Sequence, residues 1–251
     1  MANIISVHSF RRGTGKSNLA ANVAYLLAAA GQRIGVIDID LQSPGIHIML
    51  GFDEDRIVHT LNHYLWDECQ IEEAVYDLSD SLGLAEPGRL FLVPASTDLI
   101  EISRMLNSGY EVSRLNRGIF AMIQTFQLDQ LVLDTHAGMN EETLITLAIS
   151  DALAIILRPD QQDLFGTAVM VDVARKLEVP NIALIINNIP PTFDIAGLVQ
   201  QVEQVYQCPV AAAIPLSEQV MGLASAGIFA QCYPEHPITA ELRQVAEKLG
   251  H

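Results

Sequence analysis

Apolar runs of strand length recur along the chain, and a turn or a charged residue follows each one. These runs are 4–7, 33–37, 90–94, 130–134, 152–158, 182–186 and 211–215. Segments of helical character lie between them, at 18–30, 99–107, 111–126, 141–149, 163–177, 195–206 and 238–249. Continuous apolar strands that alternate with helices are typical of a parallel sheet covered by helices on both faces. The pattern predicts an α/β fold with a mostly parallel sheet.

The chain contains no internal repeat, low-complexity tract or linker, so residues 1–251 are predicted to form one domain. The longest apolar runs stop short of the ~18 residues that a membrane-spanning helix needs. No signal peptide is visible at the N-terminus. The three cysteines, Cys69, Cys208 and Cys232, lie far apart, which suits a reducing compartment. We therefore expect a soluble, cytoplasmic protein without a transmembrane segment.

A glycine-rich turn follows the first apolar run, and ligands of a parallel sheet bind beyond the carboxyl ends of its strands. Gly13 and Gly15 allow the backbone to point its N–H groups inward, and the next helix offers unpaired N–H groups. Lys16 adds a charge for the β- and γ-phosphates, and Ser17 offers a hydroxyl for Mg²⁺. An ordinary glycine turn is the alternative, but these residue types at a strand-to-helix junction favour a phosphate loop. The predicted nucleotide-binding residues here are Gly13, Thr14, Gly15, Lys16, Ser17 and Asn18.

The loop departs from the usual GxxxxGK[ST] pattern, because Phe10 stands at the first glycine. Its second half resembles the deviant Walker A loop, KGGxGK[ST], of the MinD/ParA family. The resemblance implies a single-domain P-loop NTPase that uses ATP and Mg²⁺. Arg11 falls at the family's signature lysine, which crosses a dimer interface to the partner's phosphates, so Arg11 is expected to act in catalysis. Arg12 falls at the first of two glycines, and no role is predicted for it.

Two aspartates close the second apolar run, in the stretch Val36-Ile37-Asp38-Ile39-Asp40. Residues two apart on a strand point the same way, so both carboxylates can face the site. A plain strand-end turn is the alternative reading, but the neighbouring phosphate loop favours a functional pair. By the resemblance, Asp40 orients or deprotonates the attacking water, and Asp38 supports the Mg²⁺ shell.

The run 130–134 ends in Asp134, and Thr135-His136-Ala137-Gly138 follows. An apolar strand, an aspartate and a glycine-containing turn form a Walker B pattern, so Asp134 is predicted to bind Mg²⁺. Gly138 is expected to follow the γ-phosphate as part of switch II. His136 is interpreted as a tolerated loop residue, and a charge-sensing role is the alternative.

Asparagine and proline residues near the C-terminal half resemble the family's base pocket. Asn187 follows an apolar strand, where the family's asparagine reads adenine, and Asn188 takes a position often held by arginine. Pro215 lies in an Ile-Pro segment whose backbone flanks the base in the family, and 158–160 fills the corresponding loop. Simple turn roles remain the alternative for each. No aspartate sits in a guanine-reading NKxD motif, so ATP is preferred to GTP.

The chain is strongly acidic, with a formal net charge of −16. Such a charge disfavours nucleic acid and anionic lipid unless a local basic patch overrides it. MinD proteins carry a basic amphipathic helix that binds membrane, and no such segment follows 238–249. Residues 192–251 hold two basic and six acidic residues. We expect neither a membrane-targeting helix nor non-specific DNA binding.

Acidic residues are concentrated in the segment 53–86, which holds ten of them against the single basic residue Arg56. A solvated helical face is the plainer interpretation. The alternative is a docking face for a basic segment of an unidentified protein partner, made dependent on nucleotide by the adjoining switch.

The family resemblance implies a slow, partner-stimulated ATPase that forms a homodimer when ATP is bound and positions or partitions a cellular cargo. A nucleotide-binding regulator with little or no hydrolysis is an alternative, motivated by the unusual residues 10–12. A metal-insertion accessory ATPase is a less favoured alternative, because no cysteine pair lies near Gly138.

Overall fold

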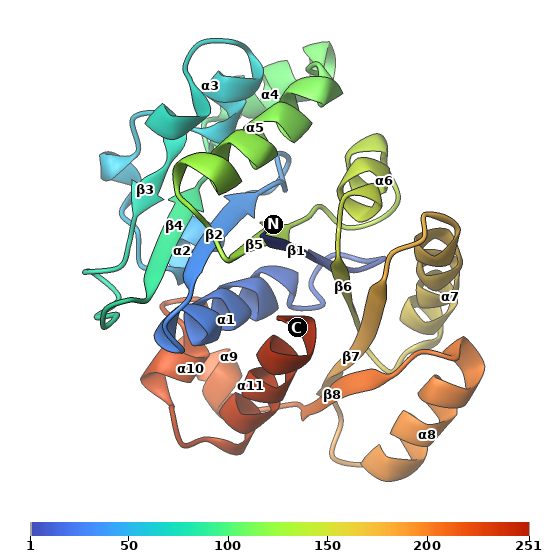
Figure 1. The fold of residues 1–251 in the computed structure, drawn as a ribbon. Coiled ribbons are helices and arrows are strands. Elements are labelled where there is room, and N and C mark those ends of the chain that lie inside the picture. The colour runs from blue at the N-terminus through green and yellow to red at the C-terminus, as the bar shows by residue number, and fades with distance from the viewer. Residues whose placement is uncertain (1, 251) are drawn as a thin grey trace.

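A computed structural model describes residues 2–250 of the chain, and its centre is one eight-stranded sheet (Figure 1). The strands are β1 (Asn3–His8), β2 (Arg33–Asp38), β3 (Tyr76–Asp77), β4 (Arg89–Val93), β5 (Gln130–Asp134), β6 (Ala152–Leu157), β7 (Asn181–Ile189) and β8 (Val210–Pro215). Their order is β3-β4-β2-β5-β1-β6-β7-β8. Only the pairing of β3 with β4 is antiparallel. The predicted mostly parallel sheet is confirmed.

Helices connect the strands and cover the sheet on both sides. They are α1 (Lys16–Ala29), α2 (Ile46–Met49), α3 (Leu61–Leu65), α4 (Leu99–Ser108), α5 (Val112–Thr125), α6 (Glu141–Ala148), α7 (Gln161–Lys176), α8 (Ile195–Tyr206), α9 (Glu218–Leu223), α10 (Phe229–Cys232) and α11 (Pro237–Leu249), with short 3₁₀ turns η1 (Glu54–Arg56) and η2 (Ile71–Ala74). The seven predicted helices are all present. The acidic segment 53–86 is built from η1, α3, η2 and β3, so it is not one continuous helical face. Within residues 2–250, no helix combines the length and the apolar character that crossing a bilayer requires.

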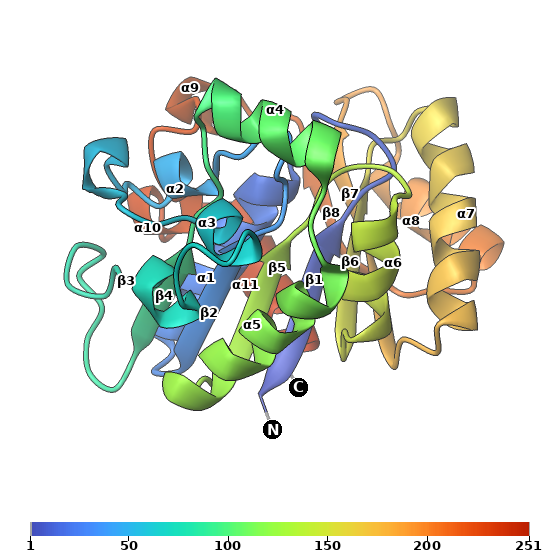
Figure 2. The same cartoon turned by 90° about the horizontal axis from the view of Figure 1, so that it is seen from above.

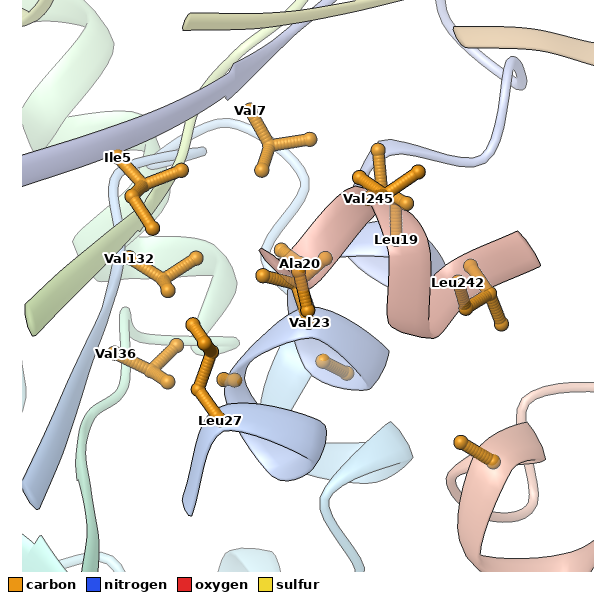
Figure 3. Close-up of a cluster of buried hydrophobic side chains, with 14 of the residues drawn as sticks. Ile5, Val7, Leu19, Ala20, Val23, Leu27, Val36, Val132, Leu242 and Val245 are labelled. Atoms are coloured by element: carbon orange, nitrogen blue, oxygen red, sulfur yellow. The ribbon is translucent and has the colours of Figure 1, made fainter. Parts of the chain in front are cut away.

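Helix α1 lies between the sheet and α11, and this explains its alanine-rich sequence. Ile5 and Val7 point from β1 toward α1, while Leu242 and Val245 of α11 approach it from the other side (Figure 3). A helix with apolar contacts on both sides needs small side chains and shows little amphipathicity. In Figure 2, α5 and α6 lie on the opposite side of the sheet from α1 and α11. The covered sheet thus fixes α1 directly behind the loop that precedes it.

The strand order gathers the loops of the candidate site at one edge. Strand β1 is central, between β5 and β6, and β5 also pairs with β2. In this register Asp134 is the direct partner of Asp38 on one side and of Val7 on the other. Residues separated by about a hundred positions in sequence therefore become neighbours at the carboxyl ends of the strands.

Replacing Leu27 tests how much the apolar layer between α1 and the sheet contributes to the free energy of unfolding. Leu27 is buried in this layer, near Val36 and Val132 (Figure 3). Leu27→Ala should lower the free energy of unfolding by about 2–5 kcal/mol, because it removes apolar contacts and leaves a cavity. The control Leu106→Ala, at a position 59% exposed on α4, should change it by less than about 0.5 kcal/mol. Urea unfolding of both variants without nucleotide makes the measurement, and equal losses would contradict the packing described.

Candidate functional site

The loop between β1 and α1 presents backbone N–H groups at the start of a helix. Gly15 precedes α1 with a φ of +103°, a left-handed conformation that favours glycine. A Cβ at this position would also lie 2.7 Å from Nδ2 of Asn187. In the described chain no side chain caps α1, so its first N–H groups remain available to an anion. This geometry suits a phosphate group.

Lys16 lies in a small polar cavity at the N-terminal end of α1. This cavity is called the phosphate cavity below. The cavity has a volume of about 240 Å³, and its walls include Arg12, Gly13, Lys16, Ser17, Asp40 and Ser43. Lys16 is only 7% exposed. Burial lowers the pKa of Lys16, and the negative charges of Asp134 and Asp40 oppose this shift. A buried ammonium group beside uncapped N–H groups is a strong site for a phosphate chain.

Asp134 provides the oxygen atoms that a divalent cation requires. Its side chain is buried, and within residues 2–250 neither carboxylate oxygen accepts a hydrogen bond. The Ser17 hydroxyl lies nearby without the geometry of a hydrogen bond. Burial raises the pKa of Asp134 to about 7, although Ser17 and the charge of Lys16 act in the opposite direction. Mg²⁺ prefers such hard oxygen ligands, so Ser17 and Asp134 fit the ion.

Asp38 organises the loop after β2. Its Oδ1 accepts a hydrogen bond from the N–H of Asp40 at 3.1 Å, and its Oδ2 accepts from Gly45 at 3.1 Å and Ile46 at 3.4 Å. Burial and the charge of Asp134 raise its pKa well above the usual value. The sequence did not reveal this structural role. The role of Asp38 toward Mg²⁺ stays a prediction.

Asp40 is held by His136, a residue that had been interpreted as a tolerated loop position. Oδ1 of Asp40 lies 2.7 Å from Nδ1 of His136 and 3.0 Å from the backbone nitrogen of Ser43. Burial acts to raise the pKa of Asp40, but the hydrogen bonds from His136 and Ser43 and the charge of Lys16 outweigh it, and the pKa is lowered. Asp40 therefore remains a carboxylate near neutral pH.

Arg12 completes this group of contacts. Its Nη2 lies 3.2 Å from Nε2 of His136 and donates to Oε1 of Gln42 at 3.1 Å. Arg12 and His136 are 124 positions apart. No local sequence pattern connects them, which is why both were missed.

Arg11 and Phe10 dock the first half of the loop on α7. Nη1 of Arg11 lies 3.1 Å from Oδ1 of Asp160 and 3.5 Å from Oδ1 of Asp163. The ring of Phe10 lies against Gly166, where a Cβ would come within 2.1 Å of it. The loop 158–160, which was expected near the base, thus meets Arg11 within the same chain.

A second, more apolar cavity adjoins the phosphate cavity and shares Gly13 and Gly15 with it. Its volume is about 330 Å³, and its walls include Asn18, Ile156, Asn187, Asn188, Ile214 and Met221. Asn187 also donates a hydrogen bond to the carbonyl of Thr14 at 2.7 Å. Pro215 directly follows the lining residue Ile214. A flat apolar base linked to phosphates would fill both cavities.

His8, at the end of β1, holds the turn that contains Gly138. The carbonyl of Gly138 can only accept, so Nε2 of His8 carries the hydrogen and donates at 2.8 Å. Nδ1 then accepts from the hydroxyl of Thr135. Burial lowers the pKa of His8 to about 3. In the sequence, the feature that could have indicated this role is the position of His8 directly after the apolar run 4–7.

Gly138 itself has both backbone groups engaged. Its φ is +90°, and its N–H donates to the carbonyl of Ser9 at 3.0 Å. Contact between this N–H and a γ-phosphate would require the turn to move. The expected phosphate contact of Gly138 stays a prediction.

Comparison with known proteins identifies the family of this chain. Residues 2–186 match the family model described as an AAA domain. The chain belongs to this family of P-loop ATPases. The resemblance to the MinD/ParA ATPases, inferred from the loop residues, is thereby confirmed.

Relatives of this AAA-domain ATPase cover its whole length. It is 25% identical over 250 residues to an uncharacterized ATP-binding protein of Methanocaldococcus jannaschii, covering 99% of this chain and 88% of that one. It is 24% identical over 260 residues to an iron-sulfur cluster carrier protein of Pyrococcus horikoshii, covering 98% and 84%. The septum site-determining protein MinD complexed with Mg-ADP, from Pyrococcus horikoshii, has the same fold, with a TM-score of 0.81, 21% identity and coverage of 99% and 96%.

His8 makes the stability of this AAA-domain ATPase depend on pH. Its pKa is lower in the folded chain than in the unfolded chain, so the unfolded chain binds more protons below pH ~6.5. Its contribution should therefore be lost as pH falls, by about 1.4 kcal/mol per pH unit between ~6.5 and ~3. His8→Gln, which keeps a donor toward Gly138, should remove this part of the slope in urea unfolding at pH 7 and pH 5. His59→Gln is the control, and an identical slope for wild type and His8→Gln would contradict the burial described.

Proposed function

We propose that this chain is an ATP-dependent molecular switch that slowly hydrolyses ATP to ADP and phosphate. The observation that carries the proposal is the placement of buried Lys16 beside Asp40 and Asp134 at the uncapped start of α1. Phosphoryl transfer needs little beyond positioning and charge neutralisation, and these groups supply both.

Each group has a separate task in the proposed reaction. Lys16 and the N–H groups of α1 hold the β- and γ-phosphates, while Asn187 and its neighbours receive adenine. Ser17 and Asp134, with Asp38 behind them, would hold Mg²⁺, which when bound neutralises charge on the phosphate oxygens. Asp40 orients the attacking water and accepts its proton as the γ-phosphate is transferred.

Dimerisation is part of the proposal. Two ATP-bound copies would associate, and Arg11 of each copy would reach the phosphates of the other. To do so, Arg11 must leave Asp160 and Asp163, which now hold it. The switch would use this dimer to position or partition a cellular cargo, with a partner stimulating hydrolysis.

Two other functions have less support. A regulator that binds nucleotide with little hydrolysis would explain residues 10–12, but Lys16, Asp40 and Asp134 all converge on one site. Iron-sulfur carriers occur among the relatives. Within residues 2–250, however, no group of three or more His, Cys, Asp or Glu could hold a metal, and two of the three cysteines, Cys69 and Cys208, are buried.

The mass of the protein in solution tests the switch directly. Wild type should be a monomer without nucleotide and with ADP–Mg²⁺, and a dimer with ATP–Mg²⁺. Asp40→Ala should bind ATP, hydrolyse none and remain a dimer, because the nucleotide is never consumed. Arg11→Ala should bind ATP and remain a monomer, because the charge that crosses the interface is gone.

Two controls accompany this experiment. Lys16→Ala should lose about a hundredfold in ATP affinity, because it removes charged hydrogen bonds to phosphate, and should never dimerise. Arg117→Ala, at an exposed arginine of α5, should behave as wild type. A wild-type chain that binds ATP yet stays monomeric in every state would contradict the switch and favour the regulator.

The acidic segment 53–86 is proposed to dock a basic segment of a protein partner. Glu54 from this segment, with Asp98 and Glu101, lines a cavity of about 410 Å³. Leu99 and Ile100 of α4 lie beside it and are 81% and 79% exposed. Carboxylates next to exposed apolar side chains suit a segment that is both basic and apolar.

A labelled peptide that alternates arginine and leucine provides the test of this surface. It should bind wild type in 50 mM salt and bind less well in 300 mM salt, because salt screens exposed charges. Neutralising the cavity with Glu54→Gln and Glu101→Gln should weaken binding several-fold. The matched double variant Glu178→Gln with Glu218→Gln, elsewhere on the surface, should not. Equal binding by both double variants would place the peptide outside this segment.

A further inference from the structure

Three loops meet at the carboxylate of Asp40. Arg12 comes from the loop after β1, Gln42 from the loop after β2, and His136 from the loop after β5. Their side chains form a continuous set of contacts that ends on Asp40. Asp40 and Arg12 line the phosphate cavity, and the lining does not include His136. His136 therefore acts on that cavity through its neighbours.

The hydrogen-bonding groups leave one arrangement for His136. A guanidinium can only donate, and Nη2 of Arg12 has two hydrogens. One is donated to Oε1 of Gln42 at 3.1 Å, and the other points to Nε2 of His136 at 3.2 Å. Nε2 is then an acceptor, so Nδ1 carries the hydrogen and donates it to Oδ1 of Asp40 at 2.7 Å. Arg12 thus sets the tautomer that His136 presents to Asp40.

The two carboxylate oxygens of Asp40 accept hydrogen bonds unequally. Oδ1 accepts from Nδ1 of His136 at 2.7 Å and from the backbone N–H of Ser43 at 3.0 Å. The single hydrogen of the Ser43 hydroxyl is shared between the two oxygens, each at 3.2 Å. Within residues 2–250, Oδ2 has no further donor and keeps lone pairs for a water molecule, whereas two full donors occupy Oδ1. The shortest contact, from His136, fixes which oxygen is spared.

We propose that His136 is a positioning residue for ATP hydrolysis, which holds Asp40 so that Oδ2 accepts the attacking water. The proposal rests on the proposed function, because it assigns His136 to the same reaction. The side chains of His136 and Asp40 are 12% and 11% exposed, so bulk water competes little for their bond. Rotation of the Asp40 carboxylate would misplace the water, and small displacements of reacting groups cost large factors in rate.

A purely structural tie between two loops would give a different result from a positioning residue. Losing a structural tie would loosen the cavity and weaken ATP binding together with turnover. Losing a positioning residue should lower the rate of the chemical step and leave ATP affinity unchanged. The two roles are therefore separated by measuring both quantities on the same variants.

The experiment compares His136→Ala with His136→Asn in single-turnover hydrolysis. The protein is in excess over ATP, and Mg²⁺ is present. The amide nitrogen of asparagine can occupy the place of Nδ1 and restore the donor to Asp40. His136→Ala should hydrolyse at least about tenfold more slowly than wild type, and His136→Asn should recover most of that loss. The dissociation constant for a fluorescent ATP analogue should stay within about twofold of wild type for both variants.

His59→Ala is the matched control. It removes a histidine whose ring packs against His63, outside the network around Asp40, so its rate should match wild type. Thermal unfolding of every variant checks that the fold is retained.

Several results would overturn the proposal. A wild-type rate in His136→Ala would remove His136 from the reaction and leave the switch itself standing. A parallel loss of ATP affinity and rate, or no recovery in His136→Asn, would assign His136 a structural role only. If wild type binds ATP but hydrolyses none, the proposed hydrolytic switch is wrong, and the proposed role of His136 is wrong with it.

Discussion

The burial of three carboxylates around one lysine is the constraint on which the rest of the site depends. Asp38, Asp40 and Asp134 lie at or just after the ends of β2 and β5, and each is buried. Strand register makes Asp38 and Asp134 direct neighbours. Burial raises the pKa of both aspartates, and a neighbouring carboxylate adds to the shift: Asp134 acts on Asp38, and Asp40 acts on Asp134. A bound cation would offset the cost of burying these charges, which supports the proposal of Mg²⁺ at this site.

The three carboxylates differ in the hydrogen bonds that hold them. Both carboxylate oxygens of Asp38 accept hydrogen bonds from backbone N–H groups, and these bonds shape the loop around it. Asp134, in the described chain, has no hydrogen-bond donor on either oxygen. Asp40 lies between these extremes, with one oxygen engaged and the other nearly open. One residue type is thus held in three different ways within one site.

Sequence reasoning succeeded where the information is local. Apolar runs and their spacing revealed the parallel strands, and a glycine turn with Lys16 revealed the phosphate loop. The two-residue strand β3 and the short helices α2, α9 and α10 gave no periodic signal, because they are shorter than one or two periods. The roles of His8, Arg12 and His136 also escaped prediction. Each depends on partners brought close only by the sheet, as with the 127 positions between His8 and Thr135.

The cavity beside Asn187 has walls from both ends of the chain. Gly13, Gly15 and Asn18 supply one side, and Ile214, Met221 and Leu242 supply another. During synthesis on a ribosome the N-terminal part emerges first, so the loop that contains Gly13 and Gly15 is made long before Leu242. The cavity therefore cannot form on a short nascent chain, because its walls are complete only after nearly all of the described residues have been made.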